Sequence, residues 1–321
     1  MEVEVWRCDQ RSADGALYRS TETLTELGPN EVLVLHKAIG INFMDVYFKK
    51  GIYPNPGGRL GCEASGIVEA VGAAVVQFGK GDRVAYASGP NGSYSEGRII
   101  DARHLVRLPD DIEFTTAAAI LLKGMTAGML STRLTNVKGR TVLFHAAAGG
   151  VGLLAGQWLA QVGAKAIGVA GNCTKAAIAR EHGYHHVIDR AREDVTEEVK
   201  KITSGSGVQI VFDGVGRATF QTSLECASTR GWIVSFGAAS GPVEGLSVST
   251  LAPKALFLTR PTLTAYTAQR DDLVHLSEDL FRLVRGGAIT HTASIYRFGD
   301  VPDVHAALED GRTTGSLVVE V

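Results

Sequence analysis

The residues best suited to chemistry lie between Val142 and Leu154, where an apolar run passes through a turn of small residues into a second apolar run. Gly149 and Gly152 in this turn would let the backbone approach an anion, because neither carries a Cβ. A helix from about residue 152 to 162 would offer backbone N–H groups and the positive end of its dipole. We expect a nucleotide pyrophosphate there. A turn that only packs a helix against a strand has the same pattern, and Ala147 replaces the first glycine of G-x-G-x-x-G.

A second short apolar run, Ala164–Ala170, leads into Gly171, Asn172 and Lys175. In a βαβ unit this position meets the adenosine ribose of a dinucleotide. A site for NAD carries an acidic side chain there, and the sequence has none between Ala164 and Arg180. The lysine and the missing carboxylate favour the 2′-phosphate of NADPH over NADH. The alternative is a solvent-exposed lysine in the first turn of the next helix.

Length and composition indicate two domains of ordinary size. The chain has 321 residues, 45% of them hydrophobic and 21% charged, with a formal net charge of −2. This charge gives no reason to expect nucleic acid as the main partner. We expect no apolar run that approaches the ~20 residues of a membrane helix, and the first residues alternate like a strand rather than a signal peptide. We therefore expect a cytoplasmic protein that does not enter a membrane.

The elements that position these residues show two kinds of sequence pattern, one β-rich and one that alternates strands with helices. Residues 1 to about 110 contain short alternating runs separated by Gly, Pro and Asn, as in a small barrel or sandwich. From Phe114 to about Leu134 the pattern is helical, and strands then alternate with helices, which predicts a doubly wound parallel sheet. After a helix over Asp271–Arg285, a β-like tail again resembles the β-rich first part of the chain. The two ends of the chain are therefore expected to form one discontinuous domain.

Several short motifs, in their order and spacing, carry a resemblance that covers nearly the whole chain. They are Asn42–Tyr47, Gly51–Pro54, Gly61–Gly66, Gly81–Val84, Lys123–Ala127, Ala147–Gly152, Asp213–Gly216, Val234–Gly237, Thr259–Leu263 and Arg312–Gly315. With them the chain resembles the zinc-independent quinone oxidoreductases, or ζ-crystallin-like proteins, of the medium-chain dehydrogenase/reductase superfamily. This family also has alanine in place of the first glycine of the turn.

The resemblance implies an α/β protein with a GroES-like β-rich catalytic domain (residues 1–123 and 263–321) and a Rossmann domain that binds NADPH (residues 124–262). It implies a quinone substrate in the cleft between them. It places three side chains around the nicotinamide and the acceptor: Asn42, Tyr47 and Tyr53. Tyr47 or Tyr53 would donate a hydrogen bond to a quinone oxygen and Asn42 would orient it, unless the tyrosines are only packing aromatics.

The family pattern also assigns the cofactor contacts. Thr126 and Phe236–Gly237 would lie at the nicotinamide end, and Lys175 with Arg312 at the 2′-phosphate. Many relatives have an Asn-Tyr pair where this chain has Asp189-Arg190. Arg190 is expected to replace a hydroxyl contact to the phosphate with a stronger one, whereas the charge of Asp189 would weaken phosphate binding. The remaining cofactor residues surround the pyrophosphate and ribose: Ala148, Gly149, Gly150, Val151, Gly152, Gly171 and Asn172.

No zinc site is expected. Zinc alcohol dehydrogenases of the wider superfamily have metal-binding residues where this chain has Asn42 and Cys62, and an asparagine is not a competent zinc ligand. The four cysteines (Cys8, Cys62, Cys173, Cys226) form no C-x-x-C pair, so a cysteine-rich zinc lobe and disulfides are not expected either. Without a Lewis acid the site suits an electron-poor acceptor such as a quinone, which delocalises incoming charge.

Two other functions remain open. An α,β-unsaturated aldehyde or ketone also accepts a hydride by conjugate addition without a metal. In a different class, some ζ-crystallin-like relatives are associated with binding AU-rich RNA or with abundance in the lens, alongside or instead of enzyme activity. Relatives pair an edge strand in homodimers, and the apolar run Ala255–Thr259 predicts such an edge.

Overall fold

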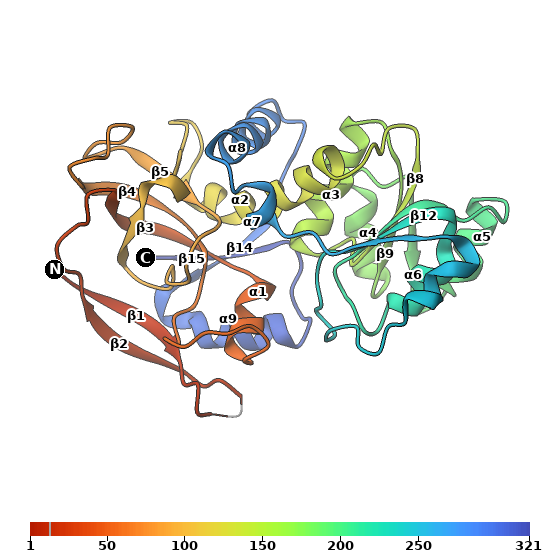
Figure 1. Ribbon diagram of the computed structural model, residues 1–321, viewed down its shortest axis with the longest axis horizontal. Coiled ribbons are helices and arrows are strands. Elements are labelled where there is room, and N and C mark those ends of the chain that lie inside the picture. The colour runs from red at the N-terminus through yellow and green to blue at the C-terminus, as the bar shows by residue number, and fades with distance from the viewer. Residues whose placement is uncertain (13) are drawn as a thin grey trace. The chain divides into compact units, whose positions relative to one another are not determined.

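The computed structural model describes residues 1–12 and 14–321, which form two compact units (Figure 1). Unit 1 contains the two ends of the chain: Met1–Leu122, Thr267–Arg285 and His291–Val321. Unit 2 contains Lys123–Tyr266 and the short segment Gly286–Thr290. The sequence did not predict that this short segment returns to the second unit.

Unit 2 is built around a six-stranded parallel sheet in the order β10-β9-β8-β11-β12-β13. Its strands are β8 (Thr141–His145), β9 (Lys165–Ala170), β10 (His186–Asp189), β11 (Val208–Asp213), β12 (Ala227–Ser235) and β13 (Phe257–Thr259). The chain moves outward in one direction from β8 to β10 and in the other from β11 to β13. The order therefore reverses between β8 and β11, and ligands of such sheets bind at the carboxyl ends of the strands at this point.

Helices connect these strands: α3 (Gly150–Gln161), α4 (Cys173–Arg180), α5 (Val195–Ile202) and α6 (Phe220–Cys226), followed by a 3-10 segment (Val248–Lys254) and α7 (Leu263–Tyr266). Right-handed crossovers in opposite directions place the helices on both faces of the sheet. Leu143, Ile167, Val211 and Ile233 from four neighbouring strands lie in one buried core cluster. The predicted doubly wound sheet is confirmed.

Unit 1 contains a seven-stranded sheet and a separate antiparallel hairpin. The hairpin pairs β1 (Glu2–Cys8) with β2 (Leu17–Thr23). The sheet consists of β3 (Glu31–Ile41), β4 (Glu63–Val71), β5 (Arg83–Tyr86), β6 (Gly97–Asp101), β7 (Val106–Arg107), β14 (Ala293–Arg297) and β15 (Ser316–Glu320). Long β3 pairs with β6 through its first half, with β15 through its last residues, and with β4 along its length. Both ends of the chain therefore build one sheet, as the GroES-like prediction requires.

Helices α1 (Phe43–Lys49), α8 (Arg270–Arg285) and α9 (Val301–Glu309) belong to unit 1, with 3-10 turns at Ala102–His104 and Phe298–Asp300. Helix α8 buries Leu273, Leu276, Leu280 and Phe281 at helical spacing, which is the pattern that made it predictable. Val301 and Val304 of α9 join the main core of this unit.

Helix α2 (Phe114–Gly128) continues as a π-helical turn (Met129–Arg133) and contains the boundary between the units. These 20 residues contain an 18-residue window with a mean hydropathy of 1.2, and this is the single helix among the described residues that is long and apolar enough to cross a membrane. The expectation that no apolar run approaches that length is therefore wrong for this segment. Its most apolar window is 72% buried inside the protein, as in a core helix.

Candidate active site

The turn between β8 and α3 lies at the point where the strand order of unit 2 reverses. Strand β8 ends at His145, and Ala146 then adopts a left-handed backbone with φ of 56°. A non-glycine residue pays about 1–2 kcal/mol for this conformation, and such strain is concentrated at functional sites. Ala147 donates its backbone N–H to the Val169 carbonyl of the next strand at 2.9 Å, which holds the turn against the sheet.

Gly149 is the N-cap of α3 and has no side chain to cap the first-turn N–H groups. These donors, from Gly150 onward, are therefore available to an anion. A Cβ on Gly149 would meet only the Ala146 carbonyl oxygen, at 3.2 Å. A Cβ on Gly152 would lie 2.4 Å from that oxygen, so the missing side chain of Gly152 lets the helix pack on its own turn. The structure thus gives the two glycines different roles.

The predicted ribose and 2′-phosphate residues converge at the end of β9. Asn172 caps α4, because its Oδ1 accepts the backbone N–H of Lys175 at 2.9 Å. The Arg190 guanidinium lies over Gly171, 3.8 Å from the position that a Cβ would occupy. Partial burial lowers the pKa of Lys175, and the positive charge of Arg190 lowers it further. Two cations therefore lie within electrostatic reach of one another, an arrangement that a bound phosphate would stabilise.

Two other charged residues are placed differently. Asp189 is buried, and its carboxylate accepts the backbone N–H of Ala191 at 3.1 Å and lies 3.9 Å from Arg192, so it is used within its own loop. Arg312 belongs to unit 1, where it is exposed and forms an ion pair with Asp310 at 3.0 Å. Its expected contact with the 2′-phosphate stays a prediction.

The residues predicted for the nicotinamide end lie on two elements. Phe236 follows β12, donates its backbone N–H to the Asp213 carbonyl at 2.9 Å, and packs its ring 5.5 Å from that of Phe144. A Cβ on Gly237 would lie 2.4 Å from the Gly214 carbonyl oxygen, so the ends of β11 and β12 can approach closely only with glycine here. Thr126 is half-buried near the end of α2.

A buried polar network fixes the carboxyl ends of β8 and β11, and the sequence did not predict it. Asp213 is fully buried, and its carboxylate accepts hydrogen bonds from the hydroxyls of Thr219 and Ser223 at 2.7–2.8 Å and from the backbone N–H of Gly216 at 3.0 Å. The Ser223 hydroxyl also lies 3.1 Å from His145 Nε2. Burial lowers the pKa of His145, which favours its neutral form. The network joins two strands and α6 beside the turn.

In unit 1, a buried carboxylate holds Asn42. The Asn42 side-chain nitrogen donates to Glu63 Oε2 at 2.8 Å, and the backbone N–H of Leu122 donates to Glu63 Oε1 at 2.6 Å. Glu63 lies opposite Gly40 in the β3–β4 register, where a Cβ on Gly40 would be 2.2 Å from the carboxylate. Asn42 also forms a capping box with Asp45 at the start of α1, so its side chain is held from two sides.

Aromatic side chains cluster around α1. The ring of Tyr47 meets that of Tyr53 edge-on, with centroids 5.3 Å apart, and meets Phe43 at 5.6 Å. Phe48 meets Tyr53 in the same manner at 5.5 Å. Tyr47 is 7% exposed and Tyr53 is half-buried. The structure therefore brings the two predicted tyrosines together, and their roles toward a substrate stay predictions.

A second buried network, centred on Asp45, orders the start of α1. Asp45 Oδ2 accepts the backbone N–H of Asn42 at 2.8 Å and the Tyr94 hydroxyl at 2.9 Å. The same hydroxyl lies 2.8 Å from His305 Nε2. Burial, followed by the Asp45 charge, raises the pKa of Tyr94, and burial lowers the pKa of His305 to about 4. Asp45 therefore positions Asn42.

The residues present do not fit a catalytic zinc ion. Cys62 is buried beside Glu63, but Glu63 is occupied by two N–H donors and Asn42 presents an amide. Over residues 1–12 and 14–321 no three His, Cys, Asp or Glu side chains are grouped to hold a metal. Zinc sites need at least three protein ligands. That the protein works without zinc remains a prediction.

Comparisons with known proteins bear on this arrangement. The zinc-binding dehydrogenase family model matches residues 150–278, and the alcohol dehydrogenase GroES-like domain matches residues 28–110. A quinone oxidoreductase from Pseudomonas aeruginosa is 44% identical over 299 residues, which cover 92% of each chain. The 2-haloacrylate reductase of a Burkholderia species is 37% identical, with 91% of each chain covered.

Among solved structures, the quinone oxidoreductase of Escherichia coli in complex with NADPH superposes with a TM-score of 0.96 at 40% identity, covering 99% of this chain and 100% of that one. The resemblance inferred from the motifs is therefore confirmed, as is the pairing of a GroES-like domain with a Rossmann domain. The chain belongs to the quinone oxidoreductases of the medium-chain dehydrogenase/reductase superfamily.

Proposed function

We infer that this protein is an NADPH-dependent quinone oxidoreductase. The observation that carries the cofactor assignment is the convergence of Lys175 and Arg190 at the end of β9, next to a helix N-terminus suited to a pyrophosphate. Relatives named quinone oxidoreductases over nine-tenths of the chain support the acceptor class. One of the matching structures is described as a complex with NADPH.

When bound, NADPH supplies a hydride to the acceptor. We propose that the first-turn N–H groups of α3 bind its pyrophosphate and that Lys175 and Arg190 neutralise its 2′-phosphate. Gly171 and Asn172 lie at the ribose, and Thr126, Phe236 and Gly237 surround the nicotinamide end. The exposed Arg312 is proposed as a further phosphate contact.

For the acceptor we propose Tyr53 or Tyr47 as the hydrogen-bond donor to a quinone oxygen. This donor would stabilise the negative charge that develops on the oxygen during reduction. Asn42 would orient the reacting groups, because its side chain is itself held by the hydrogen bond to Glu63. The aromatic rings around α1 would limit water at the acceptor.

We propose that this reaction needs no zinc ion, because a quinone spreads the incoming negative charge over a conjugated ring. A second substrate class has support of its own. A relative at 37% identity is named a 2-haloacrylate reductase, and a haloacrylate carries a double bond conjugated to a carboxylate. Reduction of α,β-unsaturated carbonyl compounds is therefore the alternative activity.

We propose that the protein is a homodimer paired through β13. This strand is the edge of the unit 2 sheet, and Phe257 and Leu258 on it are 50% and 36% exposed. Phe257 stacks on Trp232 of the neighbouring strand with centroids 5.0 Å apart, which presents a flat apolar surface. An unpaired apolar edge strand pairs readily with a second copy.

We propose a cytoplasmic location. The four cysteines all lie in the described part of the chain and form no disulfide there, and Cys8, Cys62 and Cys226 are buried. Free thiols are typical of proteins in a reducing compartment. Cell fractionation with an antibody to the protein tests this proposal.

The proposed function is tested by following NADPH consumption by the purified protein with an ortho-quinone, a para-quinone and an alkenal in parallel. The expected result is turnover of a quinone at a rate that a chelator does not lower. Turnover of the alkenal alone would replace the quinone with the unsaturated carbonyl class. NADPH binding without turnover of any acceptor would contradict an enzymatic role and favour a binding protein, with RNA as the ligand to test.

A further inference from the structure

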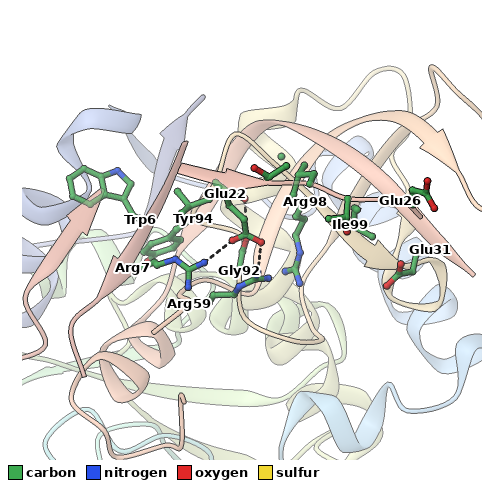
Figure 2. A pocket seen from close by; sticks show the side chains of 16 residues that line it. Trp6, Arg7, Glu22, Glu26, Glu31, Arg59, Gly92, Tyr94, Arg98 and Ile99 are labelled. Carbon is green, nitrogen blue, oxygen red and sulfur yellow. Dashed lines mark hydrogen bonds and ion pairs between the residues drawn. The ribbon is translucent and has the colours of Figure 1, made fainter. Parts of the chain in front are cut away.

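Unit 1 contains a cavity of about 220 Å³ between the β1–β2 hairpin and the segment from Gly92 to Ile99 (Figure 2). None of the residues predicted to bind NADPH or the acceptor lines it. At ~30 Å³ per water molecule the cavity holds about seven waters, or one small organic ion. The side chains that give it chemical character are Trp6, Arg7, Glu22, Arg59 and Arg98.

Arg98, on β6, is only 6% exposed and lines this cavity. Its Nη1 donates to the Pro90 carbonyl at 2.9 Å, and its guanidinium packs over the Tyr86 ring at 5.5 Å. Its Nε is buried without a hydrogen-bond partner, and over the described part of the chain no carboxylate pairs with it. A buried cation without a counter-charge is costly. Arg98 therefore lacks the anion that such a position requires.

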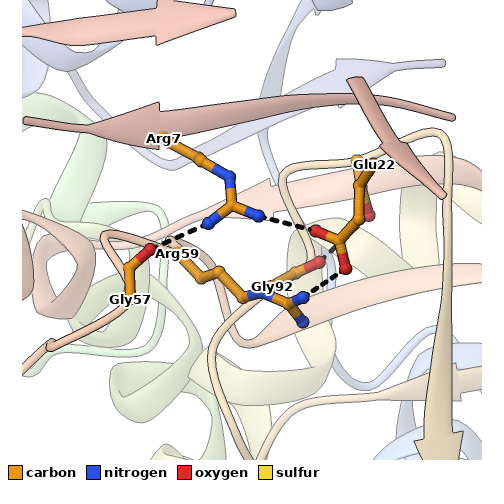
Figure 3. Close-up of polar contacts among 6 residues, drawn as sticks. Arg7, Glu22, Gly57, Arg59 and Gly92 are labelled. Carbon is orange, nitrogen blue, oxygen red and sulfur yellow. Dashed lines mark hydrogen bonds and ion pairs between the residues drawn. The ribbon is translucent and has the colours of Figure 1, made fainter. Parts of the chain in front are cut away.

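Two more guanidinium groups face the same cavity and share one carboxylate (Figure 3). Glu22 Oε2 accepts Arg7 Nη2 at 2.9 Å, and Glu22 Oε1 pairs with Arg59 Nη2. Arg7 also donates to the Gly57 carbonyl at 2.9 Å. One negative charge between two positive ones leaves this trio with a net charge of +1. Together with Arg98, the wall therefore has three guanidinium groups and one paired carboxylate.

The remaining acidic residues of the cavity do not neutralise this wall. Glu31 Oε2 accepts the backbone N–H of Gly28 at 2.8 Å, and Glu26 is exposed. Figure 2 shows Glu26 and Glu31 at the end of the cavity opposite Arg7 and Arg59. Gly92 lies at the basic end, where the Arg98 guanidinium carbon is 3.5 Å from the position of a Cβ.

We propose that this cavity binds a small oxyanion, a carboxylate or phosphate group on a molecule of metabolite size, through Arg98 and Arg59. The planar guanidinium presents a rigid fork of donors that matches two oxygens of a carboxylate or phosphate. A small ligand fits the cavity volume, and its negative charge would supply the counter-ion that Arg98 lacks. The proposed anion contacts are separate from the residues predicted to bind NADPH and the acceptor, although Tyr94, which donates to Asp45, also lines the cavity.

Titration calorimetry on the full-length protein tests the proposal, with sodium malonate and sodium phosphate as probes at constant ionic strength. NADP⁺ is kept present so that the predicted nucleotide site does not capture phosphate. The variants are Arg59→Ala, Arg98→Lys and, as the matched control, Arg11→Ala. Arg11 lies between β1 and β2 with a side chain 93% exposed, outside the cavity lining.

Saturable binding of at least one probe at one site per chain is expected. Arg59→Ala should weaken it by about tenfold or more, since it removes a charge-assisted contact. Arg98→Lys should also weaken it, because the ammonium group keeps the charge but loses the planar fork of donors, and Arg11→Ala should leave it unchanged. Binding of malonate alone or phosphate alone would identify the chemical class. If Arg98→Lys fails to fold, Arg59→Ala alone tests the proposal. The Arg59 side chain is 46% exposed, so its removal should leave the fold intact. No saturable binding, or binding that Arg59→Ala leaves intact, would overturn the proposal.

Discussion

Replacing Lys175 with alanine removes one of the two cations at the end of β9. In the free protein these charges oppose each other, since Arg190 lowers the pKa of Lys175. A bound 2′-phosphate converts this repulsion into two attractive contacts, so the variant loses a charge-assisted contact while Arg190 keeps the second. Such a contact contributes about 1.5–3 kcal/mol. This corresponds to a Kd for NADPH that is about 10- to 150-fold higher.

The assay is a fluorescence titration of the wild-type protein and the variant with NADPH and with NADH. NADH lacks the 2′-phosphate, so its Kd should stay within about twofold. Lys165→Ala is the matched control, because Lys165 is an exposed lysine at the first residue of β9, whereas the predicted phosphate site lies beyond the last residue of that strand. It should change neither dissociation constant.

Equal weakening of NADPH and NADH by Lys175→Ala would refute the reasoning. It would mean that Lys175 supports the fold of α4 or contacts a part common to both cofactors. Unchanged binding of NADPH would refute it as well, because the phosphate would then lie elsewhere. Urea unfolding of the variant separates these outcomes from a loss of folded protein.

Further expectations concern the acceptor, the stability and the assembly. Tyr53→Phe keeps the ring contacts of Tyr53 and removes its hydroxyl, so kcat with a quinone should fall about 2- to 12-fold, the effect of one hydrogen bond; an unchanged kcat would leave Tyr53 as a packing residue. Burial lowers the pKa of His36 and of His305 from 6.5 to about 4. Between these values the unfolded chain binds protons that the folded protein does not, so stability is complete above pH 6.5 and falls as pH drops toward 4, by about 2 kcal/mol per histidine at pH 5. Urea unfolding at pH 7 and 5 should show this loss, and His305→Gln should remove its own part; an identical pH dependence in the variant would contradict the assignment. Light scattering should give a dimer mass for the wild-type protein and a monomer mass for Phe257→Glu, whereas a wild-type monomer would defeat the proposed β13 interface.

The sequence predicted most of unit 2 because its signals are local. Apolar runs alternate with helical patterns from β8 to β12, and each strand end is marked by glycine or a polar residue. The left-handed backbone of Ala146 was not predictable, since alanine has no preference for it and the sheet imposes it. The network around Asp213 was missed for a similar reason. Its partners Thr219, Ser223 and His145 meet only after β8, β11 and α6 have packed.

In unit 1 the resemblance named Asn42, Tyr47 and Tyr53, but not the residues that hold them. The contact of Asn42 with Glu63 depends on the pairing of β3 with β4 and on the space left by Gly40. A charged residue inside the apolar stretch after Gly61 was the signal for Glu63. The basic cavity at Arg98 left no sequence signal, because residues from five separate segments line it.

The central claim is that the protein transfers reducing equivalents from NADPH to a quinone without a metal. Initial rates of para-quinone reduction by NADPH and by NADH, measured on one preparation stripped of metal by a chelator, test it most directly. The account predicts full activity with NADPH after stripping and a kcat/KM at least about tenfold lower with NADH. Activity that returns only when zinc is added, or equal kcat/KM for the two cofactors, would contradict it.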